Sequence, residues 1–235
     1  MAVMRESVLK VNSSNSANSA TPVAAAGAAR KLSLTKVLMH PAAKPIVFAL
    51  CLLPFAWLLY AAITNQLGAN PAEALVRSTG DWTLRFLCIV LAVTPLRTLA
   101  NVPALARFRR MLGLFVYFYV VMHGLSYSWF DMEFVVADII KDIIKRPFIL
   151  VGFSAFVLLT PLAATSFNRA IKTLGAKRWQ LLHKLVYVIA GLGLLHFFWM
   201  RSGKNDFAEV AVYAAILGGL LGWRLVRRLN SKKIA

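Results

Sequence analysis

Three of the four histidines in this sequence lie inside long apolar segments: His123, His183 and His196. An ionisable side chain is costly in the hydrocarbon of a membrane, so each of them is a candidate functional residue. Imidazole binds haem iron, and two imidazoles can bind one iron from its opposite faces. The alternative is a structural role, in which each ring hydrogen-bonds a neighbouring helix. His40 stands beside Pro41, before the first apolar segment, and we expect it at the surface.

The spacing of these histidines indicates which of them can meet. Counted at about 1.5 Å per residue from the inner ends of their segments, His123 lies about 18 Å from Met111 and His196 about 22 Å from Leu181. Both segments are expected to cross the membrane in the same direction. We therefore predict one haem b between His123 and His196, in the outer half of the membrane. His183 lies about 20 Å further in, where a second haem stays an open alternative.

The ligands of a second haem are not evident from the sequence. Arginines, not histidines, stand thirteen or fourteen residues before His123, and of these Arg109 is the expected contact at an inner site. The thirteen residues between His183 and His196 correspond to about 140° on an ideal helix. A shared helix face would therefore require local overwinding, which Gly191 and Gly193 would permit.

The elements that position these residues are predicted to be membrane-spanning helices. The chain is 59% hydrophobic and only 15% charged, against about 45–50% and about 25% in soluble domains. Six apolar segments approach the length of roughly 20 residues that a membrane span needs. These are Pro45–Ile63, Trp82–Leu96, Met111–Phe130, Phe148–Thr165, Leu181–Met200 and Phe207–Trp223. We predict an all-α polytopic membrane protein with six transmembrane helices, the second of them short, with Arg85 near its end and reaching the interface.

The charges predict the orientation and the limits of the membrane domain. The net charge is +18, but the basic residues form clusters in alternate connections, as the positive-inside rule requires of cytoplasmic loops. This distribution excludes nucleic acid as the partner, favours the lipid bilayer and places both termini in the cytoplasm. We expect a disordered cytoplasmic tail over residues 1–36, a six-helix domain over 37–228 and a basic cytoplasmic tail over 229–235.

Motifs of catalytic or nucleotide-binding domains are absent from the sequence, which has neither a G-x-G-x-x-G run nor a phosphate loop. We therefore expect an electron-transfer protein with no catalytic residues of its own and with a separate donor and acceptor. The acidic residues Asp131, Glu133, Asp138 and Asp142 are expected near the outer haem. There they could attract an acceptor that carries a basic patch.

Two runs of residues resemble a known family. One is Arg109–Leu114 followed by His123, and the other is Gly175–Tyr187 with its W-x-x-L-H-x-L-V-Y pattern, followed by His196. They resemble the haem-binding membrane subunits of bacterial protein-methionine-sulfoxide reductase systems (MsrQ), within the ferric-reductase-like transmembrane superfamily. The resemblance extends from about residue 37 to about residue 228.

This resemblance implies a multi-pass protein of the bacterial inner membrane with His123, His183 and His196 as candidate haem ligands. It also implies association with flavin mononucleotide (FMN) and electron supply from quinol or a cytoplasmic flavin reductase. The implied acceptor is a periplasmic molybdenum-containing reductase that repairs methionine sulfoxide in oxidised proteins. Larger members of the superfamily carry two histidines on each corresponding helix and a fused dehydrogenase domain. This sequence departs from them on both points.

Two other functions remain as alternatives. A stand-alone transmembrane ferric reductase would use the same haem without a protein acceptor, and a transporter would line a pathway with the histidines and bind no haem. The absorption spectrum of the purified protein separates the transporter from the haem proteins.

Overall fold

The computed structural model describes residues 34–203 and 205–233, and within these ranges it is built from helices without strands. Six of its helical segments are long and apolar enough to cross a membrane, which confirms the predicted fold class. The elements are α2 (Ala43–Ile63), α3 (Pro71–Leu99), η1 (Pro103–Phe108), α4 (Arg109–Phe130), α5 (Val136–Lys145), α6 (Pro147–Ala164), α7 (Asn168–Leu174), α8 (Ala176–Leu182), α9 (Leu185–Ser202) and α10 (Ala208–Lys233).

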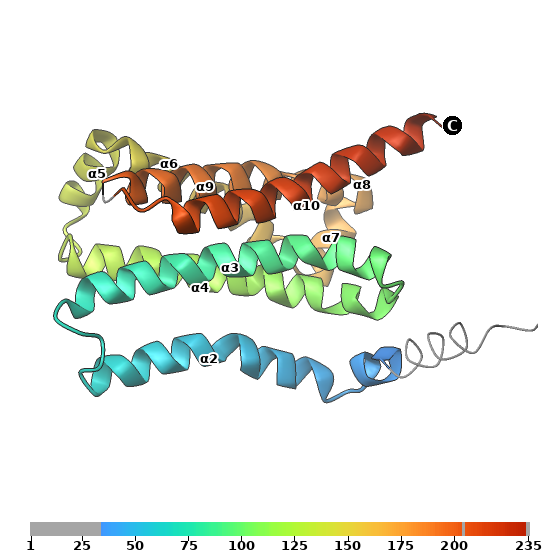
Figure 1. The fold of residues 1–235 in the computed structure, drawn as a ribbon, viewed down its shortest axis with the longest axis horizontal. Coiled ribbons are helices and arrows are strands. Elements are labelled where there is room, and N and C mark those ends of the chain that lie inside the picture. The colour runs from blue at the N-terminus through green and yellow to red at the C-terminus, as the bar shows by residue number, and fades with distance from the viewer. Residues whose placement is uncertain (1–33, 204, 234–235) are drawn as a thin grey trace, which may run out of the picture.

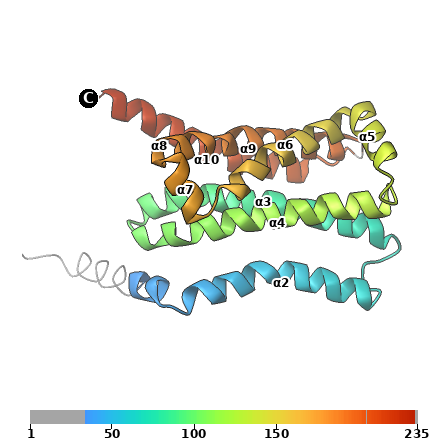
Figure 2. The same ribbon diagram turned by 180° about the vertical axis from the view of Figure 1, so that it is seen from behind.

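Two antiparallel helix pairs form the centre of the bundle (Figure 1). The helices α3 and α4 lie side by side, as do α6 and α9, and the view from behind shows the same pairs (Figure 2). The helix α10 packs on α3 and α9, and α2 packs more sparsely on α3 and α4. We call the end that holds α5 and the α2–α3 and α9–α10 connections the α5 end. The opposite end, with η1, α7 and α8, is the α8 end.

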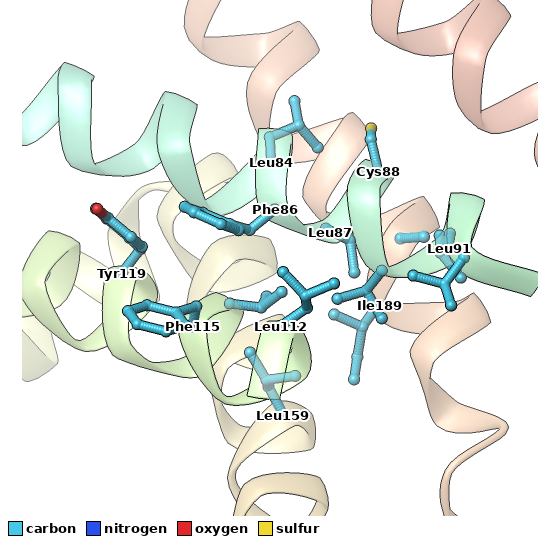
Figure 3. Packing of buried hydrophobic residues seen from close by; sticks show 14 of the residues in the cluster. Leu84, Phe86, Leu87, Cys88, Leu91, Leu112, Phe115, Tyr119, Leu159 and Ile189 are labelled. Atoms are coloured by element: carbon cyan, nitrogen blue, oxygen red, sulfur yellow. The ribbon is translucent and has the colours of Figure 1, made fainter. Parts of the chain in front are cut away.

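The core lies mainly between α3 and α4, where aromatic rings stack across the helix interface. Phe86 of α3 stacks on Phe115 and Tyr119 of α4, with ring centroids 5.8 and 5.1 Å apart. Ile189 of α9 and Leu91 of α3 extend the same cluster (Figure 3). Large apolar side chains on the outside of the bundle remain exposed, as expected where lipid is the solvent.

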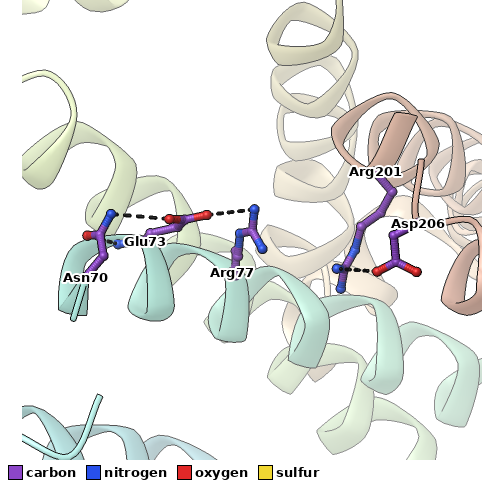
Figure 4. Close-up of polar contacts among 5 residues, drawn as sticks. All are labelled: Asn70, Glu73, Arg77, Arg201 and Asp206. Atoms are coloured by element: carbon purple, nitrogen blue, oxygen red, sulfur yellow. Dashed lines mark hydrogen bonds and ion pairs between the residues drawn. The ribbon is translucent and has the colours of Figure 1, made fainter. Parts of the chain in front are cut away.

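The predicted limits of the second span are wrong, because α3 begins at Pro71 rather than at Trp82. Pro71 occupies the first turn, where its missing N–H is not needed, and the Asn70 side chain caps the helix by accepting from the Glu73 N–H at 3.2 Å. The Glu73 carboxylate forms an ion pair with Arg77 one turn later, at 2.7 Å (Figure 4). These charges interrupt the apolar run but not the helix.

Arg85 therefore lies in the interior of α3 and not near its end, which corrects the second part of that prediction. Its guanidinium group lies 4.8 Å from the centre of the Trp82 ring, and its Nε donates to the Tyr213 hydroxyl of α10 at 3.3 Å. Arg85 is thus held by a neighbouring helix and an aromatic face.

The hydroxyl group of Tyr119 holds α2 against the bundle. It donates to the Cys51 carbonyl at 2.9 Å and accepts from the Phe55 N–H at 3.1 Å. These two groups are four residues apart, so in a regular helix they would bond to each other. Pro54, inside the same turn, lacks an N–H and weakens the helix there. A buried polar group without a partner costs about 1–3 kcal/mol, so the fully buried Tyr119 stabilises this contact.

The fifth span is interrupted at His183, where α8 ends and α9 begins two residues later. The N–H groups of Lys184, Val186 and Tyr187 bond the carbonyls three residues back, so the helix is overwound at His183 and Lys184. The overwinding that a shared helix face requires therefore lies there and not at Gly191 and Gly193. At the two ends of the chain, residues 1–33 of the predicted first tail lie outside the described residues. Residues 34–39 are helical, and α10 continues to Lys233, past the predicted domain limit at residue 228.

Candidate functional site

His123 of α4 and His196 of α9 face each other between the two central helix pairs. Their ring centroids are 6.2 Å apart and their planes make an angle of 73°. The structure thus brings together the two side chains for which the sequence predicted a common depth, and we refer to them as the histidine pair. Both residues are partly buried, and both lie nearer the α5 end than the α8 end.

Each ring of the histidine pair is fixed by one backbone carbonyl of the neighbouring helix. The His123 Nδ1 lies 2.8 Å from the Val76 carbonyl of α3, and the His196 Nδ1 lies 2.7 Å from the Phe148 carbonyl of α6. Because a carbonyl oxygen only accepts, each Nδ1 must carry the proton and donate it. Each Nε2 then keeps its lone pair, which is the form of histidine that binds a metal.

The geometry of the histidine pair fits a bis-histidine haem. Two imidazoles that bind one metal ion from opposite sides, with metal–nitrogen bonds of about 2 Å, have ring centres about 6 Å apart. The observed separation of 6.2 Å agrees with this value. Among the described residues no three His, Cys, Asp or Glu side chains are placed to hold a metal ion. The pair therefore suits a metal whose remaining ligands come from a cofactor, as those of haem iron do.

The sequence did not indicate the two carbonyls or the phenyl ring beside His196. The Phe148 ring lies 6.3 Å from the His196 ring, on the first turn of α6. Backbone acceptors have no sequence signature, because every residue carries one. Which carbonyl a histidine reaches is decided by helix pairing.

His183 forms a separate site at the α8 end. Its ring stacks on the Trp179 indole at a centroid distance of 3.9 Å, and its Nδ1 lies 3.0 Å from the Trp179 carbonyl. The indole N–H of Trp179 donates to the Thr165 carbonyl at 3.0 Å. The His183 Nε2 is shielded from solvent and lies near the Leu162 backbone. The histidine pair lies toward the other end of the bundle, so neither of its rings can share a ligand with His183.

Arginine side chains surround the His183 site. Arg109, the predicted inner contact, lies at the first turn of α4, close enough to interact electrostatically with His183. Arg224 of α10, which the sequence did not single out, lies near Arg109 and donates to the carbonyls of Leu91 and Leu220. Every Asp and Glu of the described residues belongs to the α5 half of the bundle or to a connection there. The α8 end is therefore strongly basic.

The acidic border predicted beside the outer haem is only partly present. Asp142 does not belong to it, because its carboxylate is buried, accepts from the Tyr127 hydroxyl at 2.7 Å and pairs with Arg146 at 2.9 Å. It joins α5 to α4 instead. Asp131, Glu133 and Asp138 are exposed.

A second polar group at the α5 end joins α9 to the start of α10. Arg201 lies 3.1 Å from Asp206 (Figure 4). It also pairs with Glu209. These ion pairs fix the last turn of α9, about one and a half turns beyond His196 on the same helix. They stabilise the helix that carries one ring of the histidine pair.

Comparisons with known proteins agree with these features. The family described as "Ferric reductase like transmembrane component" matches residues 79–194, a range that includes His123 and His183 and ends two residues before His196. A protein of Polaromonas naphthalenivorans is 80% identical over 190 residues, which are 81% of this chain and 87% of that protein. It is called "Protein-methionine-sulfoxide reductase heme-binding subunit MsrQ".

Two further relatives carry the same name. The one from Herminiimonas arsenicoxydans is 56% identical, and the one from Ralstonia nicotianae is 53% identical. Each alignment covers 76% of this chain and 82% of the relative. No solved structure matches the chain significantly.

Proposed function

The chain belongs to the MsrQ family of heme-binding subunits within the ferric-reductase-like transmembrane superfamily, and we propose that it carries electrons through a haem b held by His123 and His196. The electrons serve a separate methionine-sulfoxide reductase. The observation that carries this proposal is the 6.2 Å separation of the two rings, each with Nδ1 on a carbonyl. The family supports the identity of the cofactor.

The protein's own groups hold and orient the cofactor. The carbonyls of Val76 and Phe148 accept the Nδ1 protons, which leaves the Nε2 lone pair of each ring to bind a metal. A haem held by the two imidazoles would supply an iron that takes up and releases one electron. Apolar packing of α3 against α4 excludes water from the region beside the site. These residues bind and position the cofactor, and none of them has a catalytic role on a substrate.

The donor and the acceptor are proposed to meet opposite ends of the bundle. Quinol or a cytoplasmic flavin reductase supplies electrons at the α8 end, where the basic residues suit an anionic cofactor such as FMN. His183 is the proposed ligand for a group there, with Arg109 as a contact. The acceptor at the α5 end is a periplasmic molybdenum-containing reductase that repairs methionine sulfoxide.

The absorption spectrum of the purified protein tests the proposed cofactor. We expect the protein to be red, with the Soret band and sharpened α band of a reduced low-spin b-type haem after dithionite addition, because both axial positions are filled by imidazole. A colourless protein that remains colourless after reconstitution with haem would contradict the proposal and favour a transporter. A high-spin spectrum would contradict the bis-histidine site.

The orientation is tested with reporter fusions. We propose that both termini are cytoplasmic in the bacterial inner membrane, because basic residues collect at the α8 end. Alkaline phosphatase fused after Asn70 or Asp138 should be active, and fusions after Arg107 or Lys172 should be inactive. Green fluorescent protein at the same four positions should give the opposite pattern. Phosphatase activity restricted to the positions at the α8 end would invert the proposed orientation.

A further inference from the structure

Both rings of the histidine pair are held by the same arrangement of groups. In each case a helix carbonyl accepts from Nδ1, and a glycine follows four residues later in the same helix. Val76 is followed by Gly80 in α3, and Phe148 is followed by Gly152 in α6. The residue four positions on is the one whose N–H bonds that carbonyl in an α-helix. The imidazole therefore shares the carbonyl with the backbone of the glycine.

The glycines leave the space that the rings occupy. A Cβ at Gly80 would lie 3.1 Å from the His123 Cε1 and 3.2 Å from its Nδ1. A Cβ at Gly152 would lie 2.8 Å from the His196 Nδ1 and 2.9 Å from its Cε1, which is closer than real Cβ atoms approach. No other glycine in the described residues has any atom within 4 Å of its added Cβ. Close approach of a side chain thus distinguishes these two from the rest.

The arrangement is repeated in the two central helix pairs. In α3–α4 and in α6–α9 the first helix supplies the carbonyl and the glycine, and the second helix supplies the histidine. The carbonyl and the histidine are 47 residues apart in one pair and 48 in the other. The two pairs lie beside each other with their first helices running in the same direction (Figures 1 and 2). The site is therefore made of two equivalent halves.

We propose that Gly80 and Gly152 are positioning residues that let each axial histidine reach its carbonyl, and that they thereby set the affinity and the reduction potential of the haem. This inference rests on the proposed function, since it assigns a role toward the haem of that site. Donation from Nδ1 makes the imidazole a more basic ligand and fixes the orientation of its ring. A more basic ligand favours the ferric iron, so loss of this hydrogen bond moves the reduction potential to more positive values.

The test compares alanine at these two glycines with alanine at two others. Gly124→Ala in α4 and Gly191→Ala in α9 are matched controls, because their added Cβ atoms meet nothing within 4 Å. Alanine forms helices better than glycine, so backbone preference does not penalise any of the four variants. The measurements are haem content per protein, haem affinity, the electron paramagnetic resonance spectrum of the ferric protein and the potential by redox titration. Circular dichroism of each variant reports folding.

Gly152→Ala should weaken haem binding about 10- to 100-fold, the usual effect of losing the hydrogen-bond partner of a metal ligand. Gly80→Ala should keep most of its haem, because the His123 ring needs to move by only a few tenths of an ångström. Its resonance spectrum should shift and its potential should become more positive. The two control variants should match the wild type.

Wild-type affinity, spectrum and potential in both Gly80→Ala and Gly152→Ala would overturn the inference alone, provided that the wild type binds haem. A wild type that binds no haem would overturn the proposed function and the inference with it. If Gly152→Ala does not accumulate in the membrane, the milder Gly80→Ala decides the question through its spectrum and potential.

Discussion

Replacing either His123 or His196 by alanine is expected to remove most of the haem from this protein. Loss of a hydrogen-bond partner of a metal ligand costs about 10- to 100-fold in affinity, and loss of the ligand itself costs more. The two substitutions should both cause loss of the same haem, because both rings belong to one site with centroids 6.2 Å apart. Haem content is measured by the pyridine haemochrome assay relative to protein, with the amount of protein in the membrane checked by immunoblot.

The other two histidines supply the controls for this experiment. His40 is exposed and its Nδ1 accepts from the Ala42 N–H at 3.2 Å, so His40→Ala should leave the haem unchanged. His183→Ala should leave the spectrum of the haem between His123 and His196 in place, because His183 lies at the opposite end of the bundle. Retention of wild-type haem content by both His123→Ala and His196→Ala would rule out the site.

Reoxidation of the pre-reduced protein is expected to be fast only when a soluble methionine-sulfoxide reductase and methionine sulfoxide are present together. Reduction of a sulfoxide requires a centre that accepts its oxygen, and an iron bound by two histidines has no open position for it. The connections at the α5 end are short in the described residues, and α5 itself is packed on α6. Among the described residues there is no group of three His, Cys, Asp or Glu side chains placed to hold a metal ion there.

This experiment follows the reduced α band by stopped flow in four mixtures: neither addition, each alone, and both. Oxygen is excluded throughout. Fast reoxidation by methionine sulfoxide alone would make this protein the terminal reductase and contradict electron delivery to a partner. Fast reoxidation by ferric chelates without any protein partner would favour the stand-alone ferric reductase instead.

The six spans could be predicted from the sequence because apolar length is a direct consequence of the thickness of the membrane. The limits of α3 could not be. Glu73, Arg77, Asp81 and Arg85 lower its hydropathy, and only the folded bundle shows how they are accommodated. Glu73 and Arg77 pair on the same helix, and Arg85 reaches Tyr213. Whether a charged residue belongs to a span can thus be decided only when its partner is known.

The meeting of His123 and His196 followed from counting residues along their helices. The overwound turn at His183 and Lys184 did not, because the glycines nearby offered an easier point of distortion. The roles of Gly80 and Gly152 were also missed. Each half consists of one carbonyl, one glycine and one histidine on two helices. Because a carbonyl belongs to every residue, only one glycine and one histidine per half recur in the sequence, and these are too few to be recognised as a repeat.

Because His183 and the histidine pair lie at different depths, electron transfer between them depends on the membrane potential. His183 and His196 are thirteen residues apart, about 20 Å of helix, or about two-thirds of a hydrocarbon layer of about 30 Å. A charge that crosses the whole layer changes its energy by about 2.3 kcal/mol per 100 mV of membrane potential. With the orientation proposed above and a membrane potential that is negative inside, the energy of an electron falls as it moves from the level of His183 to the level of His196. The fall is about 1.5 kcal/mol per 100 mV. In the proposed orientation an energised membrane is expected to drive reducing equivalents outward, and de-energising it is expected to slow their delivery even when donor and acceptor are plentiful.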